Sequence, residues 1–565
     1  MTAEGGPGSR LAKGAGVITR RRGGAAQPSR PEQPGPEQPG PEQPAGPGRP
    51  GPERPGPEQP AGQSAAANAG WLARSADLVR THWLLSALVV LGLVLRILAT
   101  IAYHPALIYV DSLKYLYDAA PGADPLGYKV ILKIVLLVGD VGTVAVLQHL
   151  VGLAMGILLY AVLRRRGAAW WLAAIAAAPV LLDAYQIQME SMIMPDVWFE
   201  AAIVAGLAVL LWRPELTTRA AVAAGFLLGV SATIRQVGEV LVLPALVYLV
   251  LATGGGWRNI GRKAVALIIA FAFPVLAYST VAYEKFGHFR LGKGQATIGR
   301  TTGAADCATL RISADARLLC PTRAEQAKGP DWLEHSKYSP LYHTTLPPGV
   351  RRGQLLAELN SAVRHQQPVR VGLAILRDSV RLFALTRTQV SSVTPISRWQ
   401  FQTTYPVYPN WITLGPHHTI VVGLQHKAFG PFYFKPLKPA FGGPAQVNHG
   451  AATFLRSYQL DGGYTPGPMF LLATLAGVAG ALLVVRRRRD TPFRGPALAC
   501  LLFTASAIIV LGASDVFEFS WRYQLPAVVT LIPGGALGIT AVVLWIRGRR
   551  GQPENTGQDS AAAAA

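Results

Sequence analysis

Long runs of apolar residues alternate with short polar stretches along most of this chain. The apolar residues come in blocks of about 18 to 22, close to the ~20 that an α-helix needs to cross a bilayer. The pattern predicts an all-α polytopic membrane protein with about ten transmembrane helices, of which 168–182 and 219–234 are short. The predicted spans are 83–103, 143–163, 168–182, 195–212, 219–234, 238–253, 263–283, 468–485, 495–513 and 524–546.

One further apolar run, "GYKVILKIVLLVG" at 127–139, is shorter and carries Lys129 and Lys133. We therefore expect an amphipathic helix on the membrane surface here and not a span. The preceding stretch "DSLKYLYDAA" is expected to form a second interfacial helix. Both belong to the first outer loop, 104–142.

The basic residues set the expected orientation, because short cytoplasmic loops are enriched in Lys and Arg. Clusters follow alternate spans, whereas the opposite short loops hold only Lys114, Arg235 and Arg522, with Lys129 and Lys133 if the surface helix is counted. We expect both termini to be cytoplasmic, in agreement with an even number of spans. The clusters are Arg164–Arg166, Arg213 with Arg219, Arg258 with Arg262 and Lys263, Arg486–Arg489 with Arg494, and Arg547 with Arg549 and Arg550.

Composition supports this class. Half of the residues are hydrophobic and only 15% are charged, with a mean hydropathy of +0.28, which is too apolar for a soluble protein of 565 residues. The net charge of +22 would suit a nucleic-acid binder. However, the positive charges lie mainly at the ends of apolar runs, so we expect the lipid bilayer and no nucleic acid as a partner.

The polar parts divide the chain into five segments. Residues 1–70 contain a Pro/Gly repeat of the form PGPEQ and are expected to be a disordered cytoplasmic tail. An N-terminal transmembrane module (83–283) and the C-terminal transmembrane helices (468–546) flank a polar segment, 284–467, expected to be a mixed extracytoplasmic domain. Residues 547–565 form a second cytoplasmic tail.

Cys307 and Cys320 lie together in that polar segment, whereas Cys500 lies in an apolar run. If the segment is extracytoplasmic, a disulfide between the first two is expected. No His stands at ligand spacing from these cysteines, so the sequence contains no zinc pattern.

Charged residues gather at the outer ends of the predicted spans. Ionisable groups at membrane depth are costly and usually face a cavity or a partner. Carboxylates together with arginines suit a site that binds a phosphate and moves a proton. The residues concerned are Asp111, Asp183, Glu190, Asp196, Arg235, Glu239, Asp515, Glu518 and Arg522.

Simpler interpretations stand beside this one. Three of the acids are expected to be solvated loop residues, namely Asp183, Glu239 and Asp515. Asp196 begins a predicted span, where an acid suits the helix dipole. Arg235 and Arg522 have neighbouring acids in sequence, Glu239 and Glu518, with which they could pair.

The chain resembles the GT-C superfamily of polytopic glycosyltransferases, which includes protein mannosyltransferases, aminoarabinose transferases and actinobacterial arabinofuranosyl- and mannosyltransferases. The resemblance rests on "YVDSLKYLYDAA", "GYKVILKIVLLVGDVGTVAVLQHLVGLAMGILLYAVLRRRG", "MESMIMPDVWFEAAIVAGL", "GVSATIRQVGEVLVLPAL" and "FSWRYQLPAVVTL", in the family's order. It covers most of 83–283 and recurs in 468–546. The composition also looks actinobacterial.

The resemblance implies transfer of a sugar from a polyprenyl-phosphate carrier to an envelope polysaccharide, lipid or protein at the outer face of the cell membrane, as part of cell wall biogenesis. Asp111 would be the catalytic base. Arg235 and Arg522 would hold the carrier phosphate, and Tyr115 and Lys129 would also contact substrate.

The chain departs from the family's pattern at Ser112, where many members carry a second acid after the first. That acid would have to come from Glu190 or Asp196. No cofactor is implied with certainty, and the need for a divalent metal is left open. "GYK" also replaces the more usual "GYP".

Two other functions use the same features. The polar belt could be the translocation path of a transporter or a lipid or lipid-linked sugar flippase, although the acids gather on one face and no inverted repeat with broken helices is evident. A ligase or scaffold for envelope polymers would use the outer segment as a binding module.

Overall fold

The computed structural model describes residues 79–109, 111–116, 127–287, 289–291, 297–336, 338–388, 390, 394–404, 412–415, 419–422, 442, 446–485 and 491–550. All of them belong to one unit that begins at Trp71. The predicted tail 1–70 lies outside the described residues, as do 551–565 of the second tail and the basic run Arg486–Arg489.

Helices occupy every predicted span, but not all are long enough to cross a bilayer. Among the described residues six are sufficiently long and apolar, or seven if α6 and α7, which are bent by 45°, form one span. Ten spans are therefore not confirmed. The six are α2 (Trp83–Ala102), α5 (Val141–Arg165), α11 (Trp257–Phe286), α20 (Gly467–Leu482), α21 (Arg494–Asp515) and α22 (Pro526–Arg550). The shorter ones are α6 (Trp170–Leu182), α7 (Ala184–Ser191), α8 (Asp196–Leu211), α9 (Thr218–Ile234) and α10 (Val242–Ala252).

Two breaks between helices place charged residues at one end of the bundle. Between α6 and α7, Asp183 leaves the helical conformation and its side chain caps α7 by accepting from the Tyr185 N–H. Between α9 and the short 3₁₀ helix η1 (Gln236–Leu241), Arg235 is extended, with φ −138° and ψ 127°. An extended residue cannot continue a helix, so the chain turns at Arg235 and its side chain projects from the turn.

The first outer loop contains two short helices, α3 (Ser112–Leu116) and α4 (Gly127–Val135). Helix α4 has nine residues. It buries Tyr128 and Leu132 but exposes Val130 and Ile134. A short helix with one exposed apolar face fits the interfacial position expected from the sequence, and it is too short to cross a bilayer.

Sheet structure is sparse in the described residues. β1 (Tyr103–His104) pairs antiparallel with β4 (Gln446–Val447), with Tyr103 opposite Val447. β2 (Ile412–Gly415) and β3 (Thr419–Val422) form a separate antiparallel pair. The β1–β4 pairing ties the end of α2 to the end of the outer segment.

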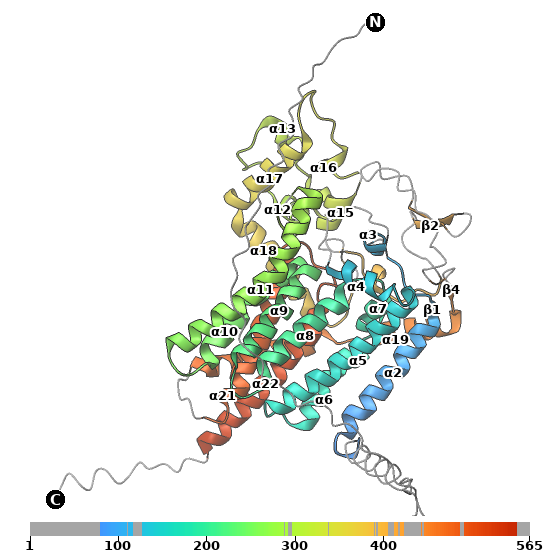
Figure 1. Cartoon of the computed structure of the whole chain (residues 1–565). Helices are drawn as coiled ribbons and strands as arrows, with labels where there is room; N and C mark the ends of the chain where they lie inside the picture. The colour runs from blue at the N-terminus through green and yellow to red at the C-terminus, as the bar shows by residue number, and fades with distance from the viewer. Residues whose placement is uncertain are drawn as a thin grey trace, which may run out of the picture. The chain divides into compact units, whose positions relative to one another are not determined.

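The outer segment forms a small helical body of its own, with a core that includes Leu310, Leu333 and Leu359. A disulfide joins Cys307 and Cys320, whose Cα atoms are 6.1 Å apart. In Figure 1 its helices group at one end of the long helices. They are α12 (Ile298–Ala304), α13 (Ala314–Arg317), α14 (Arg323–Gln326), α15 (Pro330–His335), α16 (Pro340–His343) and α17 (Arg352–Gln366).

Three elements connect this body to the bundle: α18 (Pro368–Ser379), the 3₁₀ helix η3 (Ile396–Trp399) and α19 (His449–Leu460). Helix α18 exposes Val369, Leu373 and Leu376 on one side, a pattern that suits a helix lying on a membrane surface.

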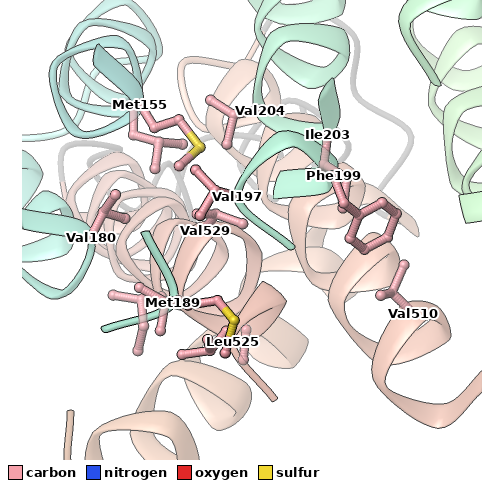
Figure 2. Packing of buried hydrophobic residues seen from close by; sticks show 14 of the residues in the cluster. Met155, Val180, Met189, Val197, Phe199, Ile203, Val204, Val510, Leu525 and Val529 are labelled. Atoms are coloured by element: carbon pink, nitrogen blue, oxygen red, sulfur yellow. The ribbon is translucent and has the colours of Figure 1, made fainter. Parts of the chain in front are cut away.

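The main core lies where the N-terminal helices meet the C-terminal ones. Figure 2 shows Met155, Val180 and Val197 packed near Val529 of α22. Helix α22 contacts α5, α6 and α8, so residues 83–283 and 468–546 pack into one bundle. Val197 follows Asp196 in sequence, and Leu525, also in this core, lies close to Arg522. The core therefore provides a rigid support beneath two charged residues.

Candidate functional site

Four charged residues from distant parts of the chain converge at one end of the bundle: Asp111, Asp196, Arg235 and Arg522. Arg522 donates from Nη1 to Asp111 Oδ2 at 2.8 Å, and from Nε and Nη2 to Asp196 Oδ1 and Oδ2 at 3.0 and 2.9 Å. Arg235 donates to Asp196 as well. One guanidinium thus bridges two carboxylates, and one carboxylate binds two guanidinium groups.

Backbone pairing brings Asp111 close to Asp196. Leu107 donates from its N–H to the Ser191 carbonyl at 2.9 Å and accepts from the Ile193 N–H at 3.1 Å. The turn that follows is closed by Ser112, whose buried hydroxyl accepts from the Tyr109 N–H at 2.9 Å. Ser112 thus shapes the turn that carries Asp111.

Arg522 lies in a sequence of turns between α21 and α22. The Tyr523 N–H donates to the Ser520 carbonyl, and the Leu525 N–H donates to the carbonyl of Arg522 itself. The guanidinium carbon of Arg522 is 5.3 Å from the centre of the Trp399 ring and 5.5 Å from that of Tyr523. Aromatic faces therefore contribute to holding the charge.

The four residues differ in exposure. The side chains of Asp111 and Arg235 are 23% and 19% exposed, whereas those of Arg522 and Asp196 are 5% and 4% exposed. The cluster therefore has a buried pair at its base and an accessible acid and arginine at its edge. Burial alone lowers the pKa of Arg522, but Asp196, Tyr523 and Asp111 together raise it well above its usual value, which keeps the guanidinium charged.

This arrangement has two chemical capabilities. The accessible carboxylate of Asp111 can take a proton from a hydroxyl group that approaches its exposed edge. The arginines at the same edge provide fixed positive charge and N–H donors of the kind that bind phosphate. Two carboxylates and two guanidinium groups balance in charge before any ligand arrives.

Glu190 lies in a second buried cluster. Its carboxylate accepts from Arg96 Nε and Nη2, both at 2.8 Å, and lies 3.0 Å from His149 Nδ1. The side chain is fully buried. Gln148 donates to the backbone carbonyls of Glu190 and Met192 at 2.8 and 2.7 Å. These contacts fix the segment that pairs with Leu107. A catalytic role for Glu190 stays a prediction.

Tyr115 and Lys129 lie on the two short helices of the first outer loop. The ring of Tyr115 packs edge-on against Tyr128, with 5.0 Å between centres, and so joins α3 to α4. Lys129 is buried on α4. Its pKa is lowered, mainly by burial and further by the positive charges of Lys133 and Lys285. Contact of either residue with substrate stays a prediction.

Two simpler expectations from the sequence are wrong. Asp183 and Asp515 are buried rather than solvated. Asp183 accepts from the Thr465 N–H at 2.7 Å and pairs with Arg387 at 3.2 Å. Asp515 accepts from Ser379 at 2.5 Å and from Gln524 at 3.0 Å. Glu239 is exposed, as expected.

A further polar network joins the outer segment to the Arg522 loop. Thr394 donates to Glu518 at 2.8 Å, and Arg398 pairs with Asp331 at 3.3 Å. Arg398 precedes Trp399, on which Arg522 packs. Burial, with a further contribution from Asp331, raises the pKa of Glu518 to about 7. Arg235 and Arg522 therefore form ion pairs with acids that are distant in sequence. Glu518 instead accepts a hydrogen bond from the outer segment.

Sequence reasoning missed Arg96, His149 and Gln148. Arg96 and His149 did carry a signal, because each is a polar residue inside a predicted span. In the part of the chain that the structure describes, no group of three or more His, Cys, Asp or Glu side chains could hold a metal ion.

No protein-family model matches the chain, and no curated protein matches it by sequence. Matching solved structures include the Saccharomyces cerevisiae protein O-mannosyltransferase Pmt1-Pmt2 complex bound to the sugar donor. It is 19% identical, with a TM-score of 0.29, over 39% of this chain and 36% of that one. The Archaeoglobus fulgidus oligosaccharyltransferase AglB, in complex with an inhibitory peptide and a dolichol-phosphate, is 14% identical, with a TM-score of 0.40, over 86% of this chain and 54% of that one.

One matched protein is a protein O-mannosyltransferase and the other an oligosaccharyltransferase. The chain spans about a third to a half of the length of these structures. With TM-scores below 0.5, the likenesses carry no argument about individual residues or substrates of this chain.

Proposed function

We propose that this chain is a membrane glycosyltransferase that moves a sugar from a polyprenyl-phosphate carrier to a cell-envelope acceptor. The observation that supports it most is the cluster of Asp111, Asp196, Arg235 and Arg522, in which an accessible carboxylate lies beside two arginines at one end of the bundle. Such a site offers both a base for an acceptor hydroxyl and donors for a leaving phosphate.

In the proposed reaction, Asp111 takes the proton of the acceptor hydroxyl while its oxygen attacks the anomeric carbon of the donor sugar. The bond between that carbon and the phosphate oxygen breaks, and its electron pair leaves with the carrier phosphate. Arg235, at the accessible edge, binds the phosphate, and Arg522 holds Asp111 in place through the 2.8 Å contact. The products are the glycosylated acceptor, the polyprenyl phosphate and a protonated Asp111, which then loses its proton to water.

Asp196 is a positioning residue in this scheme. It is almost fully buried and contacts both arginines, so it fixes the direction of each guanidinium group. Helix α8 begins at Asp196, which places the carboxylate at the positive end of the helix dipole. The position as a first-turn helix residue and the role in the cluster are therefore compatible.

The site is proposed to face the extracytoplasmic side of the cell membrane, with both termini in the cytoplasm. This orientation rests on the basic clusters, which lie at the other ends of the helices. A disulfide between Cys307 and Cys320 supports it, because disulfides persist in oxidising compartments. Polysaccharide, lipid and protein acceptors all present hydroxyl groups suited to this chemistry.

The test is Asp111→Asn in membranes supplied with a polyprenyl-phosphate sugar donor. Loss of a general base lowers turnover by about 10²- to 10⁴-fold, while the amount of protein should not change. Asp461→Asn, at an exposed position after α19, is the matched control. Undiminished sugar transfer by Asp111→Asn would exclude this residue as the base. Substrate uptake into sealed vesicles that survives the substitution would favour a transporter or flippase instead.

A further inference from the structure

An open cleft of about 1340 Å³ lies at the face of the bundle that carries the basic clusters, opposite the proposed site. It is bounded by the loop after α8, by the turn between α10 and α11, and by α20 and α21. Pockets for small molecules measure about 300–1,000 Å³. This cleft is larger, and it opens between helices that are expected to face lipid.

The walls of the cleft are apolar over the depth of one membrane leaflet. Both Arg494 and Ile508 of α21 line it, and 14 residues of helix rise by about 21 Å. Half of a ~30 Å hydrocarbon core is about 15 Å. Leu482 and Ile508 are 63% and 53% exposed there, so apolar surface is available for acyl chains.

The rim of the cleft is basic. Lys263 and Arg494 line it, and Arg258 and Arg262 lie in an adjoining hollow that shares Asn259. Arg494 donates one bond to the Leu251 carbonyl at 3.2 Å, and a guanidinium has five N–H donors, so it can also contact a phosphate. Glu215 is the acid on the rim.

A buried polar group also lines the cleft without a hydrogen-bond partner. Thr253 is 6% exposed, and its Oγ1 neither donates nor accepts in the structure. A buried hydroxyl without a partner costs about 1–3 kcal/mol, so such groups are normally satisfied by water or a ligand. Oγ1 is enclosed by protein in this structure, so a ligand oxygen at this level of the cleft would contact it only after the side chain rotates about χ1, and that rotation would give the hydroxyl the partner that it lacks.

We propose that the cleft is a binding site for an anionic diacyl phospholipid. Lys263 and Arg494 bind its phosphate, Thr253 donates to an ester carbonyl, and the acyl chains lie along α20 and α21. A polyprenyl phosphate would satisfy the two cations, but it has no ester carbonyl for Thr253. This proposal is independent of the proposed sugar transfer, because none of these residues belongs to the Asp111 cluster.

The experiment is native mass spectrometry of the full chain incubated with equal amounts of phosphatidylglycerol, phosphatidylcholine and undecaprenyl phosphate. Phosphatidylglycerol should be retained in preference to the other two. Lys263→Gln with Arg494→Gln should lower its retention by about 30-fold, the combined effect of two basic side chains at about 1 kcal/mol each. Thr253→Val should lower retention of phosphatidylglycerol but not of undecaprenyl phosphate.

Two controls separate lipid binding from a loss of fold. Lys263→Arg with Arg494→Lys should keep the retention, and Arg219→Gln with Arg547→Gln, which removes two exposed charges on the same face outside the cleft, should not change it. Equal retention of phosphatidylcholine, preferential retention of undecaprenyl phosphate, a dimer that excludes lipid, or retention unaffected by the first pair of substitutions would each overturn the proposal.

Discussion

Asp196 and Asp111 contact the same arginine, yet their substitutions should have different effects on stability. Asp196 is buried with two arginines, and removing one partner of a buried ion pair costs about 3–5 kcal/mol because the other charges stay buried. Asp111 is accessible to water, and such pairs contribute about 0–1 kcal/mol. Asp196→Ala should therefore lower the free energy of unfolding by several kcal/mol, and Asp111→Asn by less than about 1.

Thermal unfolding of both variants in the same detergent checks this difference. The measurement also separates the proposed catalytic role of Asp111 from the positioning role of Asp196. Asp111→Asn is expected to lose turnover but to keep its melting temperature, whereas Asp196→Ala is expected to lose turnover and to melt at a lower temperature. Equal melting temperatures for the two variants would mean that the buried pair contributes little to the fold.

Glu518 should give the protein a pH-dependent stability. Its pKa of about 7 lies above the usual 4.5, so between these values the folded chain keeps a proton that the unfolded chain has lost. The free energy of unfolding must then fall as the pH rises from about 4.5 to about 7. Glu518→Gln should flatten this slope in melting temperatures measured from pH 5 to 8, and Asp461→Asn should leave it unchanged. If melting temperature still falls with pH in Glu518→Gln, the pH dependence comes from other titrating groups.

At the scale of the elements, helices α5 and α7 are packed so closely that one methyl group cannot be added between them without displacing a side chain. A Cβ atom on Gly152 would stand 2.0 Å from Glu190 Oε1. Gly152→Ala must displace Glu190 from Arg96 and His149, and overpacking of this kind costs about 1–3 kcal/mol.

Gly261→Ala is the matched control for that substitution. Gly261 is also helical, in α11, but a Cβ atom there meets nothing within 4 Å. Ala is about 1 kcal/mol better than Gly in a helix interior, so the control should be neutral or stabilising. Melting temperatures for the two variants that shift in the same direction would contradict the close packing at Glu190.

The sequence located the helices well because burial in lipid requires long apolar runs, and these remain visible without any tertiary information. It could not show which charges pair. Asp111 and Arg522 are 411 residues apart, and the sequence around each residue does not indicate that the two form an ion pair. The same limit explains the errors at Asp183 and Asp515, since a carboxylate at a helix end looks alike whether it is solvated or covered by the outer segment.

For the whole molecule, the orientation can be tested by labelling single introduced cysteines in intact cells. A cysteine replacing Asp461, exposed after α19, should react with a membrane-impermeant maleimide. One replacing Arg213, after α8, should react only after permeabilisation, because the basic clusters are expected inside. The native Cys500 is buried and gives little background. The reverse labelling pattern would invert the proposed topology and move the Asp111 cluster to the cytoplasm.

The assembly of the cluster from four separate parts of the chain has a consequence for biosynthesis. Arg522 is made last, after Asp111, Asp196 and Arg235 have already emerged from the ribosome, and until it arrives Asp196 holds only one of its two arginines. A nascent chain that has inserted only its first helices would thus carry an incomplete and electrostatically unbalanced site. We therefore expect the proposed sugar transfer to begin only after α22 has packed against α5, α6 and α8, when insertion is complete.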